Sequence, residues 1–110
     1  YGAAFVRARV GCGVLMHTHD TSECFMPIEG RWMIEWEGDK GNDHVILNPM
    51  DFIAVPIGAQ RRFECIDVPK GKDEGILFAI ISGESPAVEW SPEAVKLMSE
   101  NGQSVARVTD

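Results

Sequence analysis

The sequence lacks any long hydrophobic run. No segment of the 110 residues approaches the ~18 consecutive apolar residues of a membrane-spanning helix, and none has the layout of a signal peptide. Basic residues are also scarce, since 10 Lys and Arg stand against 17 Asp and Glu and give a formal net charge of -7. The longest basic cluster is Arg61-Arg62. Because phosphate binding needs a basic patch, the sequence predicts neither a nucleic-acid partner nor a membrane partner.

Cysteine is sparse, and its spacing excludes a disulfide framework. The three cysteines, Cys12, Cys24 and Cys65, cannot all pair within one chain, and none lies in a Cys-x-x-Cys motif. A domain of this size can fold without disulfides, so we expect a reducing, cytoplasmic setting. The sequence also has no glycine-rich phosphate loop and no nucleophile with an oriented base, which argues against nucleotide-binding and triad-type hydrolytic sites.

What the sequence does have is a series of short strand-like segments separated by turn residues. About eight segments recur at roughly ten-residue spacing, a pattern typical of an all-β sandwich or barrel. They cover residues 3–10, 15–19, 23–28, 31–36, 44–47, 52–55, 61–68 and 76–82. We therefore predict one all-β domain over residues 1–110, with its barrel over about 3–83.

One short helix is predicted after the strands. Ser91 can cap its start, Pro92 suits the first helical position and Glu93 puts an acid in the first turn. Asn101-Gly102 supplies the stop. We expect a C-terminal helix over about 91–101 that closes one side or end of the barrel.

The clearest alternation falls on residues 31–36. One face of this segment carries Trp32, Ile34 and Trp36. Such an aromatic face predicts burial in the core or in a dimer interface. His44 follows a polar loop and has no partner in its own segment, so we expect it at the surface or at a strand edge. Cys12 is expected to pack.

The chemistry is concentrated between residues 11 and 30. The spacing reads Gly11, five residues, His17, one residue, His19, three residues, Glu23, six residues and Gly30. Side chains alternate along a strand, so His17 and His19 lie on one face, and Glu23 begins the next extended run. Two imidazoles and one carboxylate form a ligand set that suits divalent iron and its neighbours and leaves coordination positions open.

This block resembles the first signature motif of the cupin superfamily, which it matches at every fixed position. The second cupin motif is matched only in part. Pro56 and Gly58 agree with it, but Met50 stands where the motif has its first Gly, Arg61 where it has the fourth-ligand His, and Cys65 where it has Asn. The resemblance implies a small double-sheet jelly-roll barrel with a metal inside one end, and cupins of this size are often dimers.

Arg61 is the departure with the greatest consequence. A guanidinium stays protonated and has donors only, so it cannot bind a metal as His does. Three arrangements are open. Arg61 binds an anionic group beside a metal held by His17, His19 and Glu23; or it pairs with Glu23 and displaces the metal; or it turns outward or covers the barrel mouth, while the metal keeps three protein ligands and water.

Alternation also predicts which side chains line the barrel interior. Phe63 and Cys65 share a face with Arg61, and Phe25 shares a face with Glu23. We expect these three side chains, with Arg61, to contact a substrate.

Two functions of different classes follow from the resemblance. The first is a metal-binding cupin, with Fe, Mn, Ni or Zn as the metal ion, whose enzymatic form is a dioxygenase-like non-haem enzyme that acts on a small carboxylated molecule bound in the barrel. The alternative is a non-catalytic cupin module that binds a small molecule or anion. Fold analogy cannot choose between them. In both cases we expect a homodimer.

Overall fold

The computed structural model describes residues 1–19, 21–83 and 88–90, with the backbone alone described at residues 19 and 88–90. The described residues form nine strands and no helix, and none of them forms a helix long and apolar enough to cross a membrane. The strands are β1 (Gly2–Ala8), β2 (Gly13–His19), β3 (Glu23–Glu29), β4 (Arg31–Gly38), β5 (Gly41–Leu47), β6 (Ile53–Val55), β7 (Arg61–Asp67), β8 (Gly75–Ile81) and β9 (Val88–Trp90).

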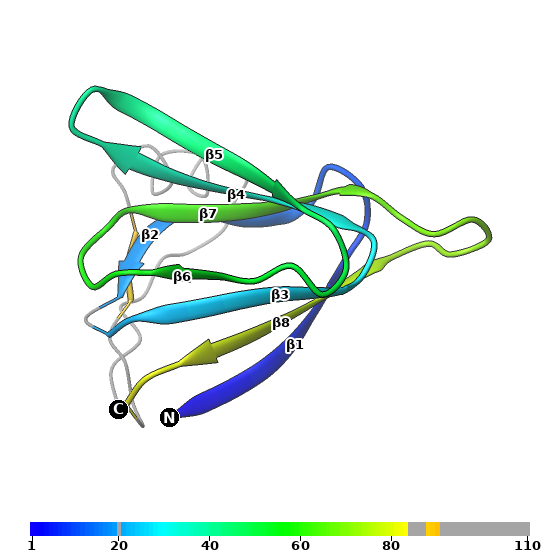
Figure 1. Cartoon of the computed structure of the whole chain (residues 1–110), viewed down its shortest axis with the longest axis horizontal. Helices are drawn as coiled ribbons and strands as arrows, with labels where there is room; N and C mark the ends of the chain where they lie inside the picture. Colours follow the sequence, from blue (N-terminus) through cyan, green and yellow to red (C-terminus); the bar gives the residue numbers. More distant parts are fainter. Residues whose placement is uncertain (20, 84–87, 91–110) are drawn as a thin grey trace, which may run out of the picture.

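The strands form two facing antiparallel sheets (Figure 1). One sheet has the order β1-β8-β3-β6, and the other has the order β5-β4-β7-β2-β9. The all-β prediction is therefore confirmed. The short strand β9, which pairs with β2 beyond the expected barrel limit at residue 83, was not predicted. The helix expected over 91–101 lies outside the described residues.

The core lies between the two sheets and is built by alternation. Trp32 and Ile34 of β4 are fully buried, as predicted, whereas Trp36 is only half-buried near the end of the barrel. The Phe63 ring packs edge-on against Phe25 and Trp32, at centroid distances of 5.6 and 5.9 Å. Such aromatic pairs contribute beyond the apolar area that they bury.

The hairpin between β4 and β5 is tighter than the sequence indicates. Residues 38–43 look like a polar turn, but Gly38 pairs with Gly41, so only Asp39 and Lys40 connect the strands. A two-residue connection lets both strands continue to the turn, and the polar residues after it belong to β5. His44 therefore lies within a strand, opposite Glu35, and is exposed as expected. Cys12, by contrast, was expected to pack and is exposed.

Met50 occupies a backbone conformation that favours glycine. Its φ is 75°, the only left-handed value at a non-glycine position within the described part of the chain. Its amide donates to the carbonyl of Pro27 at 3.0 Å, which holds the loop before β6 against β3. This is the position at which the cupin motif has Gly, so the substitution places a Cβ where the backbone disfavours one.

We predict that Met50→Gly stabilises the protein by up to about 1 kcal/mol, because relief of the left-handed conformation exceeds the entropic cost of Gly. Met50 is 73% exposed, so little packing is lost. Urea unfolding measures the change. Met50→Ala is the matched control and should show no comparable gain, because Ala keeps the Cβ. Equal stability of the Gly and Ala variants would contradict the explanation.

Candidate functional site

Three charged or titratable side chains meet inside one end of the barrel. His17 comes from β2, Arg61 from the start of β7 and Glu23 from the start of β3 in the opposite sheet. His17 and Arg61 are direct cross-strand partners, so their side chains project to the same face of the sheet. All three are buried, with Arg61 completely inaccessible and the other two 4% exposed. The sheet pairing thus unites residues that are 44 positions apart in the sequence.

The His17 ring is oriented by its own strand. Its Nδ1 lies 2.7 Å from the carbonyl oxygen of Leu15. A carbonyl only accepts, so Nδ1–H donates, and in the neutral ring the lone pair is on Nε2. Metal-binding histidines commonly have this second hydrogen bond, which fixes the tautomer and the ring orientation.

Arg61 points inward and is held by three internal contacts. Its Nε donates to the carbonyl of Ala59 at 2.8 Å, and its Nη2 donates to the carbonyl of Pro56 at 2.6 Å. Its Nη1 lies 3.5 Å from Oε1 of Glu23. The arrangement with Arg61 turned outward is therefore wrong, and the guanidinium also braces the turn between β6 and β7.

Burial controls the charge of the Glu23–Arg61 pair. It raises the pKa of Glu23 from 4.5 to about 7, although the charge and hydrogen bond of Arg61 act in the opposite direction. Burial likewise lowers the pKa of Arg61, and Glu23 partly offsets this effect. The positive charge of Arg61 is thus not sufficient to keep the carboxylate fully ionised at neutral pH.

The structure describes the side chains of only two of the three predicted metal ligands, His17 and Glu23. Among the side chains that the structure describes, no three His, Cys, Asp or Glu come close enough to hold a metal ion. The described centre contributes one imidazole and one carboxylate, both of which suit a divalent cation. His19 lies two residues after His17 on β2, where the backbone alone is described. Metal binding by His17, His19 and Glu23 stays a prediction.

Three of the residues predicted to contact a substrate are part of the hydrophobic core. Phe25 and Cys65 are completely buried in the core, and Phe63 is nearly so. Their contact with a substrate stays a prediction. The sequence did not reveal the carbonyl groups of Pro56 and Ala59 as partners of Arg61, although the Pro56-Ile57-Gly58 turn directly before β7 was the available signal.

No protein-family model matches the chain, and no curated protein sequence matches it. Solved structures do match. An oxalate oxidase superposes with a TM-score of 0.72 at 15% identity, over 94% of this chain and 51% of that chain. The vicilin from Solanum melongena, described with different anionic ligands in structurally similar pockets, gives 0.67 at 13% identity, over 93% of this chain and 30% of that chain.

A third match is the Drosophila melanogaster CENP-C cupin domain. Its TM-score is 0.64 at 16% identity, over 73% of this chain and 59% of that chain. At such identities the likeness establishes the fold. This chain spans less than two thirds of each of the three matched chains, and those chains include an enzyme as well as proteins of other kinds.

Proposed function

We propose that this chain, which has the cupin fold that the matched structures share, binds a divalent metal ion through His17, His19 and Glu23. The main support for the proposal is the orientation of the buried His17 ring. Its Nδ1–H donates to the carbonyl oxygen of Leu15, so in the neutral ring the lone pair is on Nε2. Glu23 adds a buried carboxylate from the opposite sheet. Iron, manganese, nickel and zinc all accept these ligands.

We propose that Arg61 binds a small carboxylated molecule beside this centre. A guanidinium has five N–H donors, and the three contacts of Arg61 use three of them. One N–H on each terminal nitrogen is therefore left to donate to a carboxylate. A bound metal ion would supply Lewis-acid or oxygen-activating chemistry, as in a dioxygenase-like enzyme. The protein contributes the positive charge and the exclusion of water.

The alternative function is a non-catalytic module that binds a small anion. The approach of Arg61 to Glu23 favours it, because a carboxylate paired with a guanidinium is a weaker metal ligand. The vicilin that matches in fold is described with anionic ligands in its pockets, which also supports an anion-binding function. Homodimer formation, a cytoplasmic location and the absence of nucleic-acid and membrane partners stay predictions under both functions.

Metal content separates the two functions. We expect near one metal ion per chain after loading with iron, manganese, nickel or zinc and removal of free metal, measured by elemental analysis. His17→Ala should lose the bound metal, because it removes a ligand. His44→Ala is the matched control and should keep it, since His44 is exposed on β5.

If no metal is retained by the wild-type protein, metal binding is wrong. A rise in melting temperature with small carboxylates, lost in Arg61→Met, would then support the anion-binding module. Metal retained equally by wild-type protein and His17→Ala would also contradict the proposed ligand set.

A further inference from the structure

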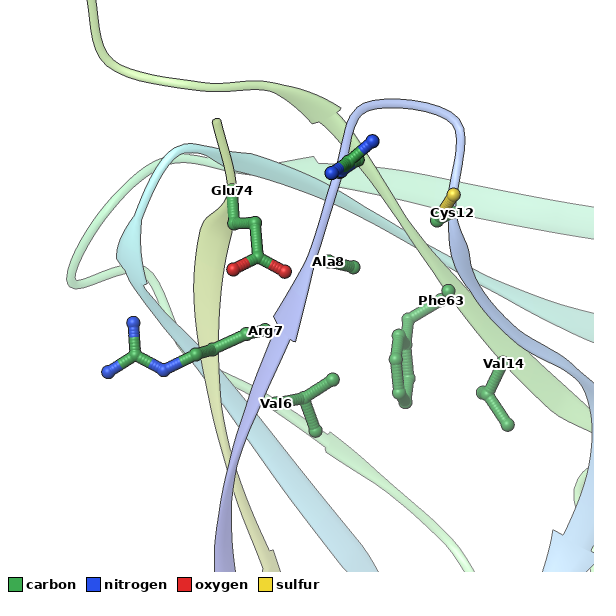
Figure 2. A pocket seen from close by; sticks show the side chains of 9 residues that line it. Val6, Arg7, Ala8, Cys12, Val14, Phe63 and Glu74 are labelled. Atoms are coloured by element: carbon green, nitrogen blue, oxygen red, sulfur yellow. The ribbon is translucent and has the colours of Figure 1, made fainter. Parts of the chain in front are cut away.

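A cavity opens at the other end of the barrel, away from His17, Glu23 and Arg61. Its volume is about 510 Å³, within the range of small-molecule sites. It lies where β1 ends and β2 begins, whereas the candidate metal site lies where β2 ends and β3 begins. Figure 2 shows the side chains that line it.

The floor of this cavity is apolar and firmly supported. It is formed by Val6, Ala8, Val14 and Phe63. Phe63 packs edge-on against the Phe25 and Trp32 rings, so the floor is continuous with the core. An apolar ligand group that covers this floor gains the transfer free energy of the area removed from water.

The rim is polar and is also held in place. Arg9 and Cys12 lie at the ends of a turn closed by a hydrogen bond from the Cys12 amide to the Arg9 carbonyl. The turn requires the positive φ of Gly11, and its backbone exchanges two hydrogen bonds with Cys65 of β7. The backbone of this turn is thus fixed to β7, a central strand of its sheet.

Charge at the rim favours an anion. Arg7, Arg9 and Glu74 line the cavity, which gives two cations against one carboxylate. No ion pair within the described part of the chain neutralises either arginine. In Figure 2 the Arg7 side chain extends away from Phe63 and Val14, so Arg7 adds positive charge at the outer edge of the rim. Arg9 adjoins the turn that carries Cys12, and we assign to it the contact with an anionic group of a ligand lying on the floor.

We propose that this cavity binds a small monocarboxylate with an apolar body, which lies on Phe63 while its carboxylate pairs with Arg9. The proposal does not rest on the metal site or on Arg61. An acyl or aryl carboxylate has both parts that the cavity accepts. A neutral molecule of the same shape would gain only the apolar contact.

Alkylation of Cys12 reports on occupancy directly, because its exposed thiol lines this cavity. The probe is octanoate, with the full chain kept in EDTA so that no metal site contributes. We expect octanoate to slow iodoacetamide labelling of Cys12 several-fold while labelling of Cys24 is unchanged, as followed by peptide mass spectrometry. Octanol should protect about tenfold more weakly, because it lacks the charge-assisted bond to Arg9.

Two substitutions at the rim test whether its charged side chains control octanoate binding. Arg9→Gln should weaken octanoate protection about tenfold, and Glu74→Gln should strengthen it. Arg31→Gln is the matched control, an exposed arginine outside the cavity, and should behave as wild type. Absence of protection, equal protection of Cys12 and Cys24, or protection unaltered by Arg9→Gln would overturn the proposal. Each result is independent of whether the protein binds metal.

Discussion

Replacing Arg61 by Met is expected to lower the free energy of unfolding of the metal-free protein by about 3–5 kcal/mol at pH 8. Arg61 is completely buried and donates to the carbonyls of Pro56 and Ala59, which lose their partner in the variant. Glu23 loses its neighbouring cation at the same time. Without that cation the pKa of Glu23 rises further above its value of about 7, so the buried carboxyl must take up a proton at pH 8, which lowers the free energy of unfolding.

Arg62 provides the matched control for this substitution. It is the next residue on β7 and points to the other face of the sheet, where it pairs with Glu35 and Glu64. Its side chain is 29% exposed, so Arg62→Met should cost less than about 1 kcal/mol. Urea unfolding in EDTA measures both variants. Equal costs would contradict the internal role of Arg61.

A double variant separates the charge effect from the bracing of the turn. Adding Glu23→Leu to Arg61→Met removes both charges, so we expect the double variant to be more stable than Arg61→Met alone at pH 8. The part of the cost that remains is assigned to the carbonyls of Pro56 and Ala59, which still lack donors. No recovery in the double variant would mean that the pair interaction contributes little.

The alternation of side chains along a strand accounts for most of the burial that could be predicted from the sequence. Trp32 and Ile34 face the core because apolar residues with a period of two bury one face of a strand, and this rule needs no knowledge of the neighbouring strands. The start of β5 was misplaced because the polar residues around His44 resemble a turn, although cross-strand pairing with Glu35 holds them in a strand. The local amino-acid composition gives no information about that cross-strand pairing.

The geometry around Arg61 depends on contacts that are distant in sequence. Its position opposite His17 follows from the β2–β7 register, which shifts between Val14 and His17. No local sequence pattern predicts such a shift in register. The same holds for the cavity beside Cys12, since its walls come from β1, β2 and β7, which meet only when the two sheets close. A sequence motif can therefore indicate which residues carry the chemistry, but not which of them already pair with each other.

The pH dependence of stability should reveal the buried carboxyl of Glu23. Its pKa is about 7 in the folded protein and near its ordinary value of 4.5 in the unfolded chain. Between these values the folded state binds a proton that the unfolded state has lost, so the free energy of unfolding falls as pH rises. The Glu23 contribution is fully present below pH 4.5 and is lost as pH rises through about 7, a change of roughly 3 kcal/mol.

Glu23→Gln removes this titration and keeps an oxygen that can accept from Arg61. We expect the stability of wild type relative to Glu23→Gln to fall by roughly 3 kcal/mol between pH 4.5 and 8, as measured by urea unfolding in EDTA. Glu37→Gln, at an exposed carboxyl on β4, should follow wild type at every pH. Parallel curves for wild type and Glu23→Gln would mean that Arg61 keeps the carboxylate ionised throughout. In that case the two side chains form a permanent ion pair, which would favour the anion-binding module over the metal site.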